Sequence, residues 1–247
     1  MCRIADGVAL LLALALAGTT FADISVITAP PSLEPSRSVT AEATGDPGSS
    51  VSTNAGGFWD ESVMASGSTP AGVITSNAAQ VSTIPNTVGA SISGSGGAGV
   101  TITSTGFAPY TYRADSTFDV FFEVTQERVY EFRGDVSWSG TLPEFNSGFT
   151  TVVFRDDTNN MSIHFAEADE MNPGGSWDIF PTLSPGIVYQ LKVRAHMSGE
   201  SGVVGNFLAL NNYSFDLYPV VPEPAALNVL ATGLLAGVLR SVRRFRR

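Results

Sequence analysis

The feature that most constrains the fold of this chain is the strict alternation of apolar and polar residues in its second half. The clearest segment is 187–196. Its odd positions are apolar or aromatic: Ile187, Tyr189, Leu191, Val193 and Ala195. Its even positions are mostly polar: Val188, Gln190, Lys192, Arg194 and His196. A period of two is that of a β-strand with one buried face. The segment therefore predicts a strand, launched by a turn at 184–186.

Other segments repeat this pattern. Between 116 and 125 the inward set is Phe118, Val120, Phe122 and Val124, and a turn at 126–127 leads into a strand over 129–134. We predict further strands over 150–154, 162–165 and 177–180, and a last one through Tyr213, Phe215 and Leu217.

The first half carries weaker signals. Short β-branched runs at 38–43, 73–76, 80–84 and 100–105 predict strands, and the Gly/Pro clusters at 46–48 and 93–99 predict turns or loops. For residues 23–50, a partly disordered linker is the alternative.

The fold class follows from these patterns, because no window between the termini shows sustained helical periodicity. We predict an all-β fold for residues 23–219, an antiparallel β-sandwich resembling a jelly roll. An N-terminal signal helix and a single C-terminal transmembrane helix complete the prediction.

Residues 1–22 have the layout of a secretory signal peptide. Arg3 precedes an apolar run over 8–17, and Thr20 and Ala22 are small residues where a signal peptidase requires them. The alternative is a buried N-terminal helix.

The C-terminal stretch, 220–247, has three parts. Pro222, Glu223 and Pro224 precede an apolar run over 225–239, and the basic end consists of Arg240, Arg243, Arg244, Arg246 and Arg247. At 1.5 Å per residue the run is about 22 Å long as a helix, against about 30 Å of hydrocarbon, so it is a marginal span. Arginines directly after the run favour a cytoplasmic location for that end.

These three parts together resemble the C-terminal signal of the PEP-CTERM family of exported bacterial proteins. The resemblance implies that an exosortase, a membrane protease of Gram-negative bacteria, recognises Pro222, Glu223 and Pro224 after a signal peptidase has removed the leader. It also implies contact with the inner membrane, then a place at the cell surface or outside the cell, and a link to exopolysaccharide and biofilm. A plain C-terminal anchor is the alternative.

Charge and cysteine content exclude several classes of function. The formal net charge is −10, and between residues 23 and 239 seven basic residues stand against 22 acidic ones. Such a surface repels nucleic acid, whose binding depends on Lys and Arg. The single cysteine, Cys2, lies in the leader, so we expect neither disulfides nor thiol chemistry in the exported body.

Candidate site residues in the body are few. Asp156, Asp157 and Asn159 form an oxygen-rich segment that suits Ca²⁺ but equally suits a plain turn. Trp138 is a candidate for stacking on a sugar, with a buried core position as the alternative. The two histidines, His164 and His196, fall on the outward phase of their strands, and we expect them at the surface.

We therefore expect an exported protein of the envelope or extracellular matrix with a structural or adhesive body. The sequence offers no recognisable catalytic residue, cofactor site or metal set, so we expect no enzyme. The alternative function is a carbohydrate-binding module that recognises exopolysaccharide.

Overall fold

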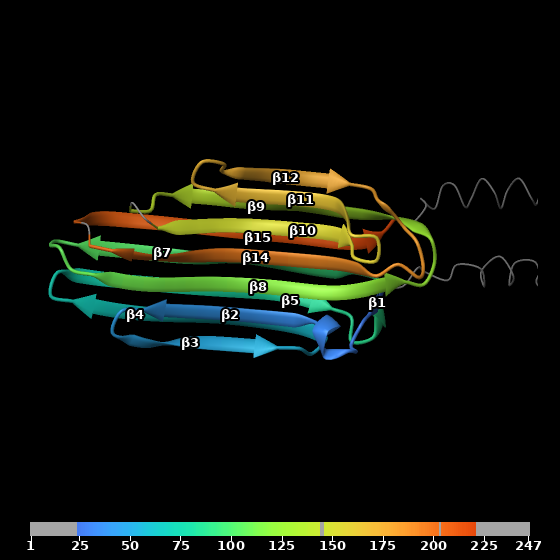
Figure 1. The fold of residues 1–247 in the computed structure, drawn as a ribbon, viewed down its shortest axis with the longest axis horizontal. Helices are drawn as coiled ribbons and strands as arrows, with labels where there is room; N and C mark the ends of the chain where they lie inside the picture. The colour runs from blue at the N-terminus through green and yellow to red at the C-terminus, as the bar shows by residue number, and fades with distance from the viewer. Residues whose placement is uncertain (1–23, 144–145, 203, 221–247) are drawn as a thin grey trace, which may run out of the picture.

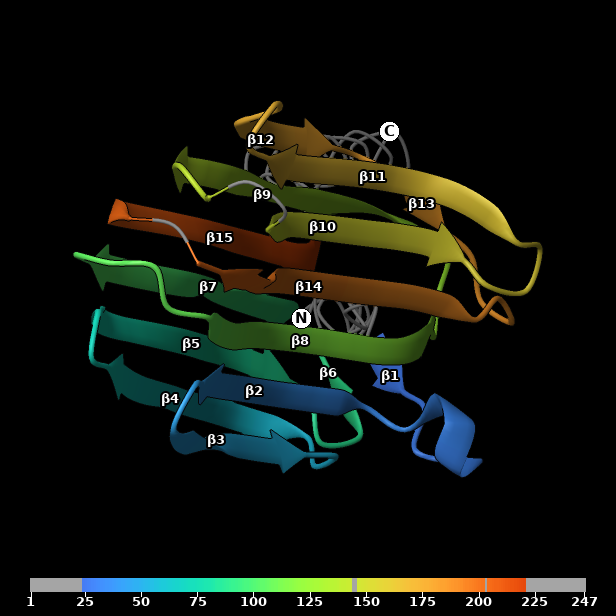
Figure 2. The same cartoon turned by 60° about the vertical axis from the view of Figure 1, so that its left-hand side comes forward.

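In the computed structural model, two antiparallel sheets pack face to face (Figures 1 and 2). The structure describes residues 24–143, 146–202 and 204–220. We call the eight-stranded sheet A and the seven-stranded sheet B. The predicted antiparallel β-sandwich is confirmed for these residues.

Sheet A is built around two long central strands, β8 and β14. Its strands, from one edge to the other, are β11 (Met161–Asp169), β10 (Ser147–Asp156), β14 (Tyr189–Ser201), β8 (Tyr110–Val124), β1 (Ile24–Val26) and β6 (Val88–Gly89), with β2 (Ser36–Ala43) also on β8 and β3 (Asp46–Thr53) on β2. β1 and β2 therefore share one edge of β8.

Sheet B has β15 and β7 at its centre. Its order is β12 (Gly174–Ile179), β9 (Arg128–Gly140), β15 (Gly205–Pro219), β7 (Ile92–Ser104), β5 (Gly72–Ile84) and β4 (Gly57–Thr69), with β13 (Thr182–Leu183) also on β9.

Successive strands often belong to different sheets. The chain passes from β7 in sheet B to β8 in sheet A, returns to β9 in sheet B and crosses again to β10. β15, the last strand, lies between β7 and β9, which are far from it in sequence. With eight and seven strands, the sandwich is larger than an eight-stranded jelly roll.

The core of the second half follows the predicted alternation. The inward residues of β8, β14 and β15 are buried: Phe118, Val120, Phe122, Val124, Tyr189, Leu191, Val193, Ala195, Tyr213, Phe215 and Leu217. Phe118 and Phe215 meet edge to face across the two sheets, with ring centroids 4.9 Å apart. Each large apolar side chain buried in this way contributes about 1.5–3 kcal/mol.

The core of the first half is made of smaller and more polar side chains. Its inward positions include Ala41, Ala43, Ala65, Ala78, Ala98, Ser76, Ser82 and Gln80. Arg37 is also buried there, where its guanidinium donates to the carbonyls of Gly57 and Ala55 and lies over the Trp59 ring. Burial lowers the pKa of Arg37.

Several predictions for the first half are corrected. The runs predicted at 73–76 and 80–84 belong to one strand, β5, and the long edge strand β4 was not predicted. The glycine cluster at 93–99, predicted as a loop, lies inside β7. The hairpin between β2 and β3 turns at Thr44 and Gly45, before the predicted turn at 46–48. The segment predicted as a possible linker forms β1, β2 and part of β3 from residue 24 onward.

The predicted fold class is also corrected, because it included two terminal helices. The described residues form strands and one short 3-10 helix, η1 (Pro31–Leu33). None of their helices has the length and apolar character needed to cross a membrane. The predicted signal helix in 1–22 and the predicted transmembrane helix in 225–239 both lie outside the described residues.

Candidate functional site

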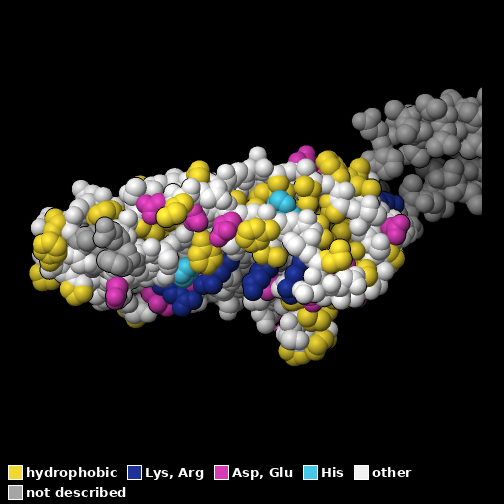
Figure 3. Space-filling view, turned by 45° about the horizontal axis from the view of Figure 1, so that its top comes forward, with side chains coloured by type: hydrophobic (Ala, Val, Ile, Leu, Met, Phe, Trp, Pro, Cys, Tyr) yellow, Lys and Arg dark blue, Asp and Glu magenta, His cyan; other side chains and the backbone are white. Residues whose placement is uncertain are grey.

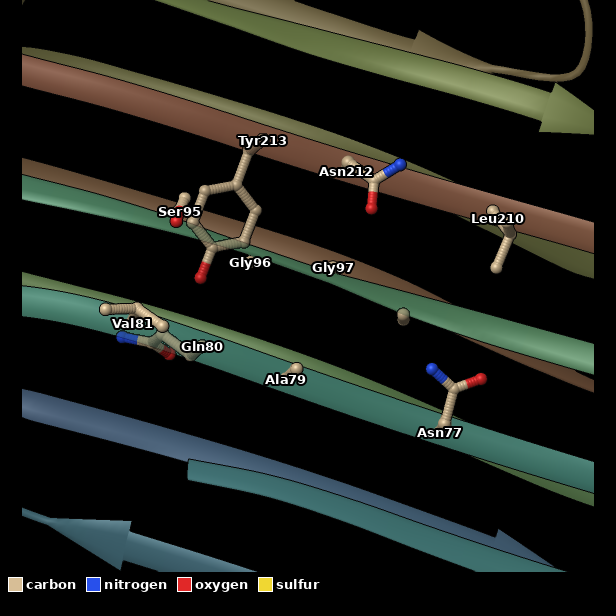
Figure 4. Close-up of a pocket in the computed structure, with 11 residues that line it drawn as sticks. Asn77, Ala79, Gln80, Val81, Ser95, Gly96, Gly97, Leu210, Asn212 and Tyr213 are labelled. Atoms are coloured by element: carbon tan, nitrogen blue, oxygen red, sulfur yellow. The ribbon is translucent and has the colours of Figure 1, made fainter. Parts of the chain in front are cut away.

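The most distinctive surface feature is a shallow groove on the outer face of sheet B (Figure 4). Its floor is the glycine-rich part of β7, around Gly97, which lies between β5 and β15. The groove has a volume of about 360 Å³. It exists because Gly97, an outward position of β7, carries no side chain and its neighbour Ala79 on β5 carries only a methyl group.

The walls of the groove come from the two neighbouring strands. β5 contributes Asn77 and Val81, and β15 contributes Leu210 and Asn212 (Figure 4). These side chains lean over the floor: a Cβ on Gly99 would lie 2.6 Å from Leu210 Cδ2 and 2.7 Å from Asn77 Oδ1. Any larger residue at Gly99 would therefore displace both walls.

The inward side of the same strand uses glycine differently. A Cβ on Gly96 would lie 2.7 Å from the hydroxyl oxygen of Tyr213, so the ring of Tyr213 occupies the space above this glycine. The Tyr213 hydroxyl is 2.9 Å from the Oγ of Ser116 in sheet A. Burial raises the pKa of Tyr213, and the hydroxyl therefore stays protonated.

The groove offers neutral hydrogen-bonding groups beside apolar ones. Asn77 and Asn212 each carry an amide that both donates and accepts, and Leu210 and Val81 supply apolar surface. Among the described residues, no Asp, Glu, His, Lys or Arg lines the groove. Its chemistry suits binding of a neutral hydroxyl-rich ligand better than acid–base catalysis.

Trp138, the predicted stacking residue, is placed between the sheets. Its exposed fraction is 8%, and Gly148 of β10 approaches so closely that a Cβ there would lie 2.5 Å from the ring. Its Nε1 donates to the carbonyl of Gly140. The ring has no open face for a sugar, and the structure supports the alternative of a core tryptophan.

The predicted calcium segment is a hydrogen-bonded turn. The Asp156 carboxylate accepts from the backbone N–H and the side-chain amide of Asn159, at 2.8 and 2.7 Å. Asp157 pairs instead with Arg155, at 2.5 Å. Nowhere in the described ranges do three or more His, Cys, Asp or Glu side chains gather as a metal site would require.

Of the two histidines, His164 differs from the surface position expected for it. His164 faces the inter-sheet space opposite Phe154, and its ring lies 4.9 Å from that of Trp177. Burial lowers the pKa of His164. His196 does lie on the outer face of sheet A, but its side chain is only 13% exposed because it is hydrogen-bonded to Asp115.

The remaining predicted site residues belong to the C-terminal stretch. Pro222, Glu223 and Pro224, and the basic residues Arg240, Arg243, Arg244, Arg246 and Arg247, lie outside the described residues. The groove residues were not predicted. The alternation along β5 could have shown that Asn77 and Val81 share the outward face, but not that they lie near Asn212.

Comparisons with known proteins provide little guidance. No family model matches the chain, and no curated protein matches it. One solved structure that the chain is similar to, the enzymatically active domain of tailspike protein 4 from bacteriophage CBA120, is 11% identical with a TM-score of 0.20. The match covers 62% of this chain and 19% of the tailspike chain. A TM-score this low does not establish a shared fold.

Proposed function

We propose that this chain is an exported protein of the bacterial envelope or extracellular matrix, with the β-sandwich as a structural or adhesive body. The observation that carries the proposal is the outer face of sheet B. Short neutral side chains lie side by side there across neighbouring strands, as in the cross-strand row Ser66, Thr75 and Thr101. Such a face can hydrogen-bond to a neutral polymer without a charge requirement.

Delivery to that location is the second part of the proposal. By its resemblance to PEP-CTERM signals, the motif Pro222, Glu223 and Pro224 would be recognised by an exosortase-type protease. The test is the mass of the mature protein isolated from its native host. We expect a C-terminus that ends near this motif, and a Glu223→Ala variant that is not processed. A chain that still ends at Arg247 in both cases would contradict this route.

The groove favours a second candidate function, recognition of a polysaccharide. Amide groups beside apolar side chains are a common way to bind sugar rings, because each amide can donate to and accept from hydroxyl groups. The ligand class expected here is a neutral polysaccharide, such as an exopolysaccharide of the host.

Binding of purified protein to isolated exopolysaccharide tests this second function. The double variant Asn77→Ala/Asn212→Ala should weaken binding at least tenfold, because it removes both amides from the walls. Asn206→Ala is the matched control, since Asn206 is an exposed amide on the same face outside the groove. Equal binding by wild type and double variant would exclude the groove as the site.

A further inference from the structure

Three polar side chains on the outer face of sheet A form a continuous hydrogen-bonded line. Asp115 Oδ1 is 2.7 Å from His196 Nδ1, and His196 Nε2 is 2.8 Å from Ser198 Oγ. None of the three residues lines the groove on sheet B. The line joins an acid, an imidazole and a hydroxyl in the order found in hydrolases with a serine nucleophile.

The strands hold these groups in place. His196 and Ser198 are two residues apart on β14 and therefore point to the same side of the sheet. Asp115 is directly opposite His196 on β8, within a ladder of thirteen consecutive residue pairs between the two strands. A group on the centre of a sheet is positioned more rigidly than one on a loop.

The Asp115 carboxylate is unusually well enclosed for a residue on an outer face. Its side chain is only 4% exposed, because Arg113 and Arg194 both donate to it and cover it. Burial alone would raise the pKa of Asp115, but the hydrogen bonds from His196, Arg113 and Arg194 outweigh this effect and hold the pKa well below its usual range. The carboxylate therefore stays ionised and only accepts hydrogen bonds.

The ionised carboxylate fixes the tautomer of His196. Since Asp115 can only accept, Nδ1 carries the proton, and the neutral ring then has an unprotonated Nε2. In this tautomer Nε2 accepts a hydrogen bond from the Ser198 hydroxyl. Arg194 Nη2 lies 3.2 Å from Nδ1, but both groups are donors and both are directed at Asp115.

We propose that Ser198 is an activated nucleophile and that this face hydrolyses short acyl esters. Ser198 Oγ would attack the ester carbonyl while its proton passes to His196 Nε2. The ester C–O bond then breaks, the leaving alcohol takes the proton from Nε2, and the acyl group remains on Ser198. Water, activated by the same Nε2, releases the acid and restores the serine.

Arg113, whose Nε donates to Asp115, would also stabilise the negative charge that develops on the carbonyl oxygen. Arg113 is the residue directly opposite Ser198 in the β8–β14 ladder, and half of its side chain is exposed. Charged donors at such a position stabilise the tetrahedral intermediate. Figure 3 shows Lys and Arg side chains close together in one row beside a histidine.

The position of Asp115, His196 and Ser198 on an outer sheet face indicates the kind of substrate. The sheet face is accessible from outside the molecule, so an ester group carried on an extended polymer can reach Ser198 as readily as a small ester. This activity goes beyond the structural or adhesive role and does not depend on it. It also departs from the expectation, drawn from the sequence, that the chain is no enzyme.

Labelling with a fluorophosphonate probe, followed by peptide mass spectrometry, tests the proposal on the intact protein. We expect one label, on Ser198, and none in Ser198→Ala. His196→Gln should lower both labelling and p-nitrophenyl acetate hydrolysis roughly 10²–10⁴-fold, the usual contribution of a general base. Asp115→Asn, which removes the positioning residue, should lower kcat and leave KM unchanged.

The matched control is Ser162→Ala, an exposed serine on β11 of the same sheet, which should label like the wild type. Circular dichroism of each variant separates loss of activity from loss of fold. A wild-type protein that takes no label at Ser198, or a His196→Gln variant that labels at the wild-type rate, would overturn the proposal. The line would then be a structural link between β8 and β14.

Discussion

At the scale of single residues, His164 shows how a strand position can mislead. Its ring lies between the sheets, near the aromatic rings of Phe132 and Trp177. The Nε2 atom is buried, and no partner for it occurs among the described residues. A protonated imidazole would therefore carry an unpaired N–H in an apolar setting, which agrees with the lowered pKa.

This arrangement predicts an acid-sensitive contribution to stability. The pKa of His164 in the folded protein lies below the ordinary value of 6.5, so as the pH falls the unfolded chain takes up the proton first. The free energy of unfolding should fall as the pH drops below about 6.5, and less steeply in a His164→Gln variant. Urea unfolding at a series of pH values measures both slopes. Identical slopes would show that His164 does not titrate in this way.

At the scale of elements, β7 is the strand whose glycines matter most. Gly96 has no positive φ, so its backbone would accept another residue, but a Cβ there would lie 2.5 Å from the carbonyl oxygen of Ala79. Replacing glycine by alanine in a strand gains at most about 1 kcal/mol. Overpacking against a backbone atom costs about 1–3 kcal/mol, and the second effect is larger here because the carbonyl cannot rotate away.

Gly96→Ala should therefore lower the free energy of unfolding by about 2 kcal/mol, the difference between the upper ends of these two ranges. Ser95→Ala is the control, since its side chain is exposed on the outer face and its removal should change stability by less than about 0.5 kcal/mol. Denaturant unfolding of both variants measures the difference. A Gly96→Ala variant as stable as Ser95→Ala would show that β5 and β7 can shift enough to admit the methyl group.

The size of the inward side chains explains which strands the sequence predicts. Where inward positions carry Phe, Tyr, Leu or Val, as in β8, β14 and β15, the alternation is plain and the strands were predicted. In β4, β5 and β7 many inward positions are Ala, Ser or Gly, so the inward and outward phases look alike. A glycine run then resembles a loop, although neighbouring strands hold it in a sheet and the rings of Tyr213 and Phe215 fill the space above it.

Sites are harder to predict than strands for a related reason. The alternation of β14 correctly placed Arg194 and His196 on one face. It carried no information on strand register, and Asp115 is 81 residues away from His196 in sequence. Only the pairing of β8 with β14 brings the two side chains together.

At the scale of the whole molecule, no boundary separates the first half of the fold from the second half. β8 pairs with β14 along thirteen residues, and β15 pairs with β7 along thirteen more, so each sheet has a long ladder at its centre. The chain crosses between the sheets from β7 to β8 and again from β14 to β15. Unfolding either half would break both central ladders and expose the core that the sheets share.

We therefore expect one cooperative unfolding transition, and tryptophan fluorescence can test it. Trp59 lies in the edge strand β4, whereas Trp138 lies in β9 near the opposite edge of sheet B. Variants that retain only one of these two tryptophans, with phenylalanine at the other tryptophan positions, report separately on the two sides. In each variant, the fluorescence midpoint should coincide with the far-UV circular dichroism midpoint, as two-state unfolding requires. If the Trp59 signal changes at lower denaturant than the circular dichroism, the β2–β5 side unfolds independently, and its small-residue core is the reason.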